Sequence, residues 1–319
     1  MEYVKVIFFL LLGFVVLVKS SDYFVDAVSS IATNFKMSKM MIALTVAAFG
    51  TCAPELAISF TSISRAAGDI ALANVLGSNV VNILLVIGLA ACVSPIRVKN
   101  EVIKKELPIL LVITSMFVIA IISHYFGGDS DFILNRQDGL LFVCFFLMFM
   151  FYIVSVVKVK QGVFTSEKPK YNMKKSIVIT ILCCILIILS SDLVVENAKE
   201  FASMLSVSNK LITMTVVVIG TSLPEMTMTV VAAKKGEFDI ALGNIIGTNI
   251  FNIGIVLGLP LIIYGGFSSS SFSIIDILFV HLAAFVLYLF AKNDKVLSKV
   301  EGAVMITLFV IYYTYIFLG

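Results

Sequence analysis

Long runs of apolar residues, separated by charged or glycine- and proline-rich breaks, cover almost the whole chain. A transmembrane helix needs about 20 apolar residues. Reading between the breaks therefore predicts ten such helices. Their expected bounds are 3–31, 40–64, 70–94, 107–126, 139–158, 176–202, 211–233, 239–264, 274–291 and 299–318. The pattern indicates an all-α membrane protein with five spans on either side of a hydrophilic segment at 158–175.

Composition places the chain in the same class. Of its 319 residues, 60% are hydrophobic and only 13% are charged, with a mean hydropathy of +1.08. Soluble domains average about 45–50% apolar and about 25% charged residues. All five cysteines lie in apolar segments, which argues against a disulfide framework. The stretch at 3–18 lacks a small-residue cleavage site after it, so we interpret it as the first span rather than as a signal peptide.

The positions of the lysines and arginines predict the orientation, because cytoplasmic loops carry an excess of positive charge. With the N-terminus outside, the inner loops hold 17 of these residues and the outer segments hold 5. We therefore expect both termini outside and a short cytoplasmic linker at 158–175. The expected location is a prokaryotic plasma membrane, in which the chain is an integral protein.

One six-residue motif occurs twice, as GTCAPE at Gly50–Glu55 and as GTSLPE at Gly220–Glu225, 170 residues later. The same offset aligns about seventy residues without a gap. Further matches are Asp22/Asp192, Thr45/Thr215, Asp69/Asp239, Asn74/Asn244, Gly77/Gly247, Asn79/Asn249, Asn82/Asn252 and Gly88/Gly258. An odd number of spans per half requires the second half, 176–319, to be inverted relative to the first, 1–157. Inverted repeats are a transporter architecture, with the binding site near the midplane.

The proline in each motif predicts a break in its helix. Pro54 has no N–H, so the carbonyl of Gly50 loses its helical donor. We expect residues 50–52 to be unwound, and Pro224 predicts the same for residues 220–222. Irregular backbone at this depth is tolerated only where protein or a polar cavity covers it.

The glutamate of each motif predicts the chemistry. A carboxylate at bilayer depth is energetically costly and normally marks an ion pathway. A purely structural proline kink would account for a single motif with its glutamate, Glu55. It accounts poorly for the same motif occurring a second time with Glu225. Two carboxylates with carbonyl and hydroxyl oxygens form the hard ligand set that Ca²⁺ takes, and Na⁺ can share it. Zinc or copper would favour histidine or cysteine thiolate, and His124 and His281 lie far from the motifs in sequence.

Uncharged polar residues extend the repeat into the next span of each half. Positions four apart share one face of a helix. The two faces predicted in this way consist of Asn74, Ser78 and Asn82 in the first half and of Asn244, Thr248 and Asn252 in the second.

Other polar residues of the repeat have structural interpretations. Asp22 and Asp192 are expected near the membrane surfaces, as caps or as hydrogen-bond acceptors between helices, with an ion-access role as the alternative. Asn79 and Asn249 point off the main polar faces, so we interpret them as amides that link helices.

These motifs, extended as ALANVLGSNVVN and ALGNIIGTNIFN, resemble those of the sodium/calcium exchangers of the calcium/cation antiporter superfamily. The resemblance covers essentially the whole chain. It implies a calcium site formed by Glu55 and Glu225 with the backbone carbonyls of Thr51 and Thr221. It also implies sodium sites that use the side chains of Thr51, Cys52, Ser78, Asn82, Thr221, Ser222, Thr248 and Asn252, together with the carbonyls of Ala48 and Val218. In this family, the first and sixth helices slide together across the other eight.

Two positions depart from the family pattern. Cys52 stands where the motif normally has serine, and Asn252 stands where many relatives carry aspartate. Two glutamates still balance the charge of Ca²⁺, but the neighbouring sodium site loses a hard ligand. Proton-coupled relatives also work with two glutamates and neutral amides, although their motif typically reads Gly-Asn-Ala. The sequence therefore favours sodium coupling and leaves proton coupling open.

The function expected from these features is secondary antiport of Ca²⁺ against Na⁺ by alternating access. The chain is expected not to be an enzyme and to need no cofactor. Its expected partners are the transported ions and the lipid bilayer, with no nucleic acid and no obligatory protein partner. An H⁺/Ca²⁺ exchanger is the alternative. A passive channel is less favoured, because pores usually assemble rings across subunits, and an intramembrane hydrolase would need catalytic groups that the motifs lack.

Overall fold

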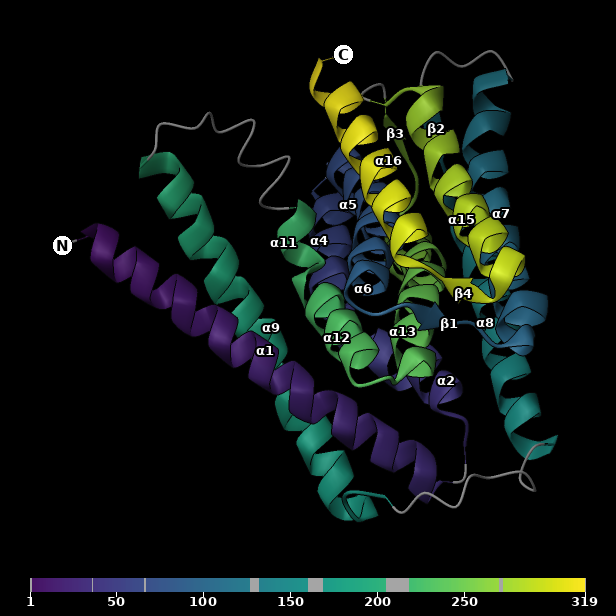
Figure 1. Cartoon of the computed structure of the whole chain (residues 1–319). Coiled ribbons are helices and arrows are strands. Elements are labelled where there is room, and N and C mark those ends of the chain that lie inside the picture. The colour runs from purple at the N-terminus through teal and green to yellow at the C-terminus, as the bar shows by residue number, and fades with distance from the viewer. Residues whose placement is uncertain are drawn as a thin grey trace.

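The computed structural model describes residues 2–35, 37–65, 67–126, 132–159, 169–204, 218–269 and 272–318, and most of them are helical (Figure 1). The α-helices are α1 (Glu2–Asn34), α2 (Lys39–Ile42), α3 (Ala48–Thr51), α4 (Ala53–Ser64), α5 (Gly68–Val80), α6 (Gly88–Val93), α7 (Leu107–Phe126), α8 (Arg136–Val159), α9 (Met173–Met204), α11 (Val218–Thr221), α12 (Leu223–Lys234), α13 (Phe238–Phe251), α14 (Gly258–Tyr264), α15 (Ile274–Asp294) and α16 (Lys299–Leu318). Short π-helical segments join several of them, namely η1 (Ala43–Ala47), η2 (Val81–Ile87), η3 (Val102–Glu106) and η5 (Asn252–Leu257).

Nine of the ten predicted spans coincide with helices of the described chain. Eight helical runs are long and apolar enough to cross a membrane, and the pair Lys39–Thr51 and Ala53–Ser64 adds a ninth span bent by 50°. The remaining predicted span, 211–233, lies partly outside the described residues, and its described part forms α11 and α12.

Two kinds of span differ sharply in burial. In the most apolar 18-residue stretch of α1, 28% of the residues are buried, and in that of α9 the share is 29%. The corresponding shares are 78% for Gly68–Val93 and 83% for Phe238–Tyr264. α1 and α9 contact each other extensively and cross beside the other helices, whereas α5 and α13 lie among their neighbours (Figure 1). The spans that follow the two motifs therefore form the centre of the molecule, and the first span of each half lies at its periphery.

Close helix contacts in the centre depend on glycine. A Cβ on Gly247 would lie 2.6 Å from the carbonyl oxygen of Leu44, so α13 packs directly on the backbone of η1. Two further crossings pair glycine with glycine. A Cβ on Gly302 would lie 2.7 Å from the oxygen of Gly88, and one on Gly139 would lie 2.8 Å from the oxygen of Gly258. Small residues let helix backbones approach this closely in membranes.

Four short strands, which the sequence did not predict, connect the two halves. β1 (Ile96–Arg97) pairs antiparallel with β4 (Val296–Leu297), and β2 (Phe132–Leu134) pairs antiparallel with β3 (Phe267–Ser269). β1 and β3 follow the α6 and α14 helices, while β2 and β4 precede α8 and α16. In Figure 1 the β2–β3 pair lies towards the top of the molecule and the β1–β4 pair lies lower.

Candidate ion-binding site

Each motif breaks its helix at one residue. Cys52 separates α3 from α4 with φ −79° and ψ 4°, and Ser222 separates α11 from α12 with φ −89° and ψ 6°. Pro54 and Pro224 then lie in the first turn of the following helix, where a missing N–H costs no helical hydrogen bond. The expected unwinding of residues 50–52 and 220–222 is therefore wrong in extent, because the backbone stays helical up to the break.

The Gly50 carbonyl, four residues before Pro54, accepts a hydrogen bond from another helix. The Cys184 thiol of α9 donates to the Gly50 oxygen at 3.0 Å. A buried carbonyl needs such a partner, so Gly50 links the broken span to α9.

The two glutamates are the most deeply buried charges of the described chain. Glu55 and Glu225 are both 0% exposed, and no side-chain oxygen of either has a hydrogen-bond partner. Their carboxylates interact electrostatically with each other. The hydroxyl of Thr51 is close to Glu225 but donates to the Ala47 carbonyl at 3.3 Å. Burying two carboxylates without counter-charge is strongly unfavourable, so this arrangement favours a bound cation.

Uncharged oxygen atoms are buried at the second break and on the helices that pack against the two glutamate helices, since α5 and η5 contact α4 while α13 and η2 contact α12. Hydroxyl or amide oxygens without a protein hydrogen bond come from Ser78, Asn82, Ser222, Thr248 and Asn252. All five side chains are 0% exposed. An ion that enters would replace its water shell with such oxygens, as Ca²⁺ does in proteins.

Cys52 is buried close to the two glutamates. Its side chain is 0% exposed, and its thiol lies beside the Thr248 hydroxyl and interacts electrostatically with Glu55 and Glu225. The equivalent position of the second motif offers the hydroxyl of Ser222. The two equivalent motif positions therefore offer different ligand atoms, the soft sulfur of Cys52 and the hard oxygen of Ser222.

Two of the amides coincide with π-helical turns. Asn82 lies in η2, and Asn252 begins η5. The Asn252 amide donates to the Asn79 oxygen at 3.1 Å, which leaves the oxygen of Asn252 unbonded. Asn79 is thus a helix-linking amide, as predicted. Asn249 is buried but forms no side-chain hydrogen bond with the described residues, so the linking role predicted for it is not observed. π-helical turns within α-helices frequently occur at functional sites.

A second layer of hydrogen bonds positions the glutamate helices. Asn74 donates to the Glu55 carbonyl at 3.1 Å and to the Ser59 hydroxyl at 3.3 Å. In the second half, Asn244 donates to the Thr229 hydroxyl at 3.2 Å. Sequence reasoning missed the two hydroxyls, although each lies four residues after a motif glutamate and hence on its face of the helix.

The predicted ligands that involve backbone atoms lie around the break. The Ala48 carbonyl accepts from the Cys52 N–H at 3.1 Å and from the Thr51 hydroxyl at 3.4 Å. Thr221 is partly exposed and lies at the end of α11. Val218 begins that helix, and its side chain lies outside the described part.

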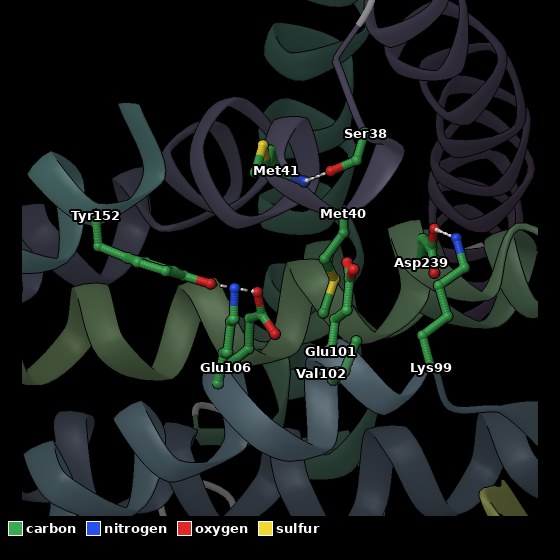
Figure 2. Close-up of a pocket in the computed structure, with 10 residues that line it drawn as sticks. Ser38, Met40, Met41, Lys99, Glu101, Val102, Glu106, Tyr152 and Asp239 are labelled. Carbon is green, nitrogen blue, oxygen red and sulfur yellow. Dashed lines mark hydrogen bonds and ion pairs between the residues drawn. The ribbon is translucent and has the colours of Figure 1, made fainter. Parts of the chain in front are cut away.

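A small pocket lies elsewhere, where the loop before α2 meets η3, α8 and the start of α13 (Figure 2). The Tyr152 hydroxyl donates to Glu106 at 2.9 Å, and Lys99 pairs with Asp239 at 2.5 Å. Neither motif glutamate lines this pocket. It is therefore separate from the buried carboxylate pair.

Comparisons with known proteins agree with this geometry. The family model described as sodium/calcium exchanger protein matches residues 5–155 and 175–318. The putative antiporter CaxA of Alkalimonas amylolytica is 36% identical, covering 95% of this chain and 96% of the relative. The sodium/calcium exchanger MaX1 of Methanosarcina acetivorans is 31% identical over 97% of each chain. A solved structure of the sodium-calcium exchanger NCX_Mj is 30% identical and superposes with a TM-score of 0.82 over 98% of each chain.

A bent pair of helices around buried carboxylates, within a bundle of apolar spans, defines a membrane cation transporter. The family match covers nearly all of the sequence. The chain belongs to the sodium/calcium exchanger family.

Proposed function

We propose that this chain exchanges Ca²⁺ for Na⁺ across a membrane by alternating access, with Glu55 and Glu225 as ligands that the two ions share. The observation that carries the proposal is the pair of fully buried carboxylates without protein hydrogen bonds. Membership of the sodium/calcium exchanger family supports the identity of the ions.

The charge of the site explains why the two ions alternate. Two carboxylates neutralise one Ca²⁺ ion, and Na⁺ ions compete for the same oxygens. The proposed Na⁺ ligands are the side chains of Thr51, Cys52, Ser78, Asn82, Thr221, Ser222, Thr248 and Asn252 and the carbonyls of Ala48 and Val218. A ligand shifts a conformational equilibrium only through different affinities for the two states. The empty site holds two uncompensated charges, so crossing without an ion is unfavourable and the gradient does not leak.

The proposed architecture is ten spans in two inverted repeats, 1–157 and 176–319, joined by the linker 158–175. Related strands support the inversion, because β1 and β3 follow equivalent helices yet belong to pairs at different heights of the molecule (Figure 1). The two glycine–glycine crossings support it as well, since Gly88 and Gly258 occupy equivalent positions. The distribution of lysine and arginine supports a plasma-membrane protein with both termini outside.

The test is ⁴⁵Ca²⁺ uptake into proteoliposomes that carry a single imposed gradient. Uptake driven by internal Na⁺ at equal pH supports the proposal. Uptake that responds only to a pH gradient would instead identify an H⁺/Ca²⁺ exchanger. Uptake that needs no counter-ion would identify a channel. Vesicles with the double variant Glu55→Gln/Glu225→Gln provide the background rate.

A further inference from the structure

An ion-pair cluster ties α1 to the end of the helix that carries Glu225. Lys235, the first residue after α12, contacts the Asp22 carboxylate at 3.1 Å, the Asp22 carbonyl at 2.6 Å and the Asp26 carboxylate at 2.6 Å. Lys170, just before α9, holds the other oxygen of Asp26 at 2.6 Å, and this contact raises the pKa of Lys170. We name Asp22, Asp26 and Lys235 the α1–α12 latch. Asp22, predicted as a cap or as a hydrogen-bond acceptor between helices, forms an ion pair with Lys235 through its carboxylate and accepts the hydrogen bond through its backbone carbonyl.

The latch connects a peripheral helix to the proposed binding site. Lys235 continues the last turn of α12, because its N–H donates to the Val231 carbonyl at 3.0 Å. Glu225 lies in the first turn of that same helix. A helix of this length is rigid, so movement of α1 at the latch and movement of Glu225 are mechanically coupled.

The first half of the chain carries the same charges at the repeat offset. The counterparts of Lys235, Asp22 and Asp26 are Arg65, Asp192 and Glu196. Arg65 directly follows α4, the helix of Glu55, as Lys235 follows α12.

The backbone at these two helix ends is the same. The N–H of Ala67 donates to the Ser62 carbonyl at 2.8 Å, and the N–H of Glu237 donates to the Ala232 carbonyl at 2.9 Å. Yet Arg65 is exposed and takes part in no ion pair within the described chain. The two halves thus share the turn and the charges but differ in whether the basic side chain is engaged.

We propose that Lys235 and Arg65 are alternating latches that stabilise opposite-facing states of the carrier. Lys235 holds α1 in the state described here, and Arg65 binds Asp192 or Glu196 of α9 in the other state. The inference rests on the proposed alternating access. In a carrier of inverted repeats, the opposite-facing state exchanges the roles of the two halves, so a contact made by one half in one state is made by its counterpart in the other.

The test measures Ca²⁺ affinity separately at the two membrane faces. Ca²⁺/Ca²⁺ exchange is recorded in right-side-out and inside-out membrane vesicles, and the ratio of the two half-saturating concentrations reports the balance of states. Lys235→Gln should shift this ratio about three- to tenfold towards the state in which the α1–α12 latch is open. Arg65→Gln should shift it in the opposite direction, and a tenfold shift equals about 1.4 kcal/mol.

The controls separate a latch from general damage. Lys39 pairs with Glu237 at 2.8 Å in the same region, but the counterpart of Glu237 is the uncharged Ala67. Lys39→Gln should therefore leave the ratio unchanged, and Lys235→Arg should restore it. If Lys235→Gln does not fold, Arg65→Gln alone carries the test, because the Arg65 side chain forms no ion pair with any residue that the structure describes.

Three outcomes overturn the latch: an unchanged ratio in both variants, a shift of equal sign in both, or an equal shift in Lys39→Gln. Failure of the proposed function looks different, because the wild-type protein would then show no Na⁺-driven Ca²⁺ uptake. A wild-type protein that exchanges Na⁺ for Ca²⁺ while its variants keep the same ratio refutes the latch alone.

Discussion

Replacing Glu225 by glutamine removes one charge from the proposed site without changing its volume. The side chain is 0% exposed, and its two oxygens have no hydrogen-bond partner in the described protein. Glutamine therefore removes no side-chain hydrogen bond to the described residues, and the effect mainly reports the charge. With Ca²⁺ bound, the variant holds one uncompensated positive charge in a buried position. Removing one member of a buried charge pair costs about 3–5 kcal/mol, which corresponds to about a hundredfold to about four-thousandfold weaker Ca²⁺ binding.

The same variant should have the opposite effect on the empty carrier. Without an ion, Glu55 and Glu225 repel each other and are both desolvated, so losing one charge should raise the free energy of unfolding of the ion-free protein. The melting temperature Tm without Ca²⁺ should rise, while the increase in Tm on adding Ca²⁺ should disappear, because that increase follows ligand affinity. The chain contains no tryptophan, so unfolding is best followed with a thiol-reactive dye that reports the exposure of buried cysteines such as Cys52.

The chain offers a matched control for this experiment. Glu106 is 7% exposed and accepts a hydrogen bond from Tyr152, but it lies in the separate pocket of Figure 2. Glu106→Gln should leave Ca²⁺ affinity unchanged. The reasoning is refuted if Glu225→Gln keeps Ca²⁺ affinity within about threefold of the wild-type value, or if Glu106→Gln weakens it equally.

Four further substitutions test the neighbourhood of the site. Cys52→Ser supplies a hard oxygen and should strengthen Na⁺ inhibition of ⁴⁵Ca²⁺ exchange about two- to tenfold. Ser222→Cys should weaken that inhibition. If Na⁺ inhibits both variants equally, these positions are not Na⁺ ligands. Gly247→Ala places a Cβ 2.6 Å from a backbone oxygen of η1 and should lower the free energy of unfolding by about 1–3 kcal/mol, measured as a lower Tm. Asn74→Ala removes the 3.1 Å bond to the Glu55 carbonyl and should destabilise by about 1 kcal/mol while Ca²⁺ still binds; complete loss of binding would instead make that amide a ligand.

Much of the fold followed from local features of the sequence. The length of each apolar run predicted nine helical spans found in the described chain, because the thickness of the bilayer sets the number of residues needed. The buried glutamates and their uncharged neighbours were found through the repeat, since each lies within a short motif. Helical spacing predicted that Ser78 and Asn82 share one helix face and that Thr248 and Asn252 share another, and all four side chains are buried.

Contacts between distant segments were decided only by the tertiary structure. The strand pairs join loops far apart in the chain, and the bond from Cys184 to Gly50 joins two halves whose local sequences give no sign of it. The extent of the helix break also escaped prediction, because the proline lies in the first turn of a new helix instead of inside an old one. Composition and periodicity therefore determined which residues lie in the membrane and which carry charge there. The packing of α1 and α9 against the remaining helices decided which charged side chains form ion pairs, for example Lys235 with Asp26. Such contacts depend on where whole helices lie.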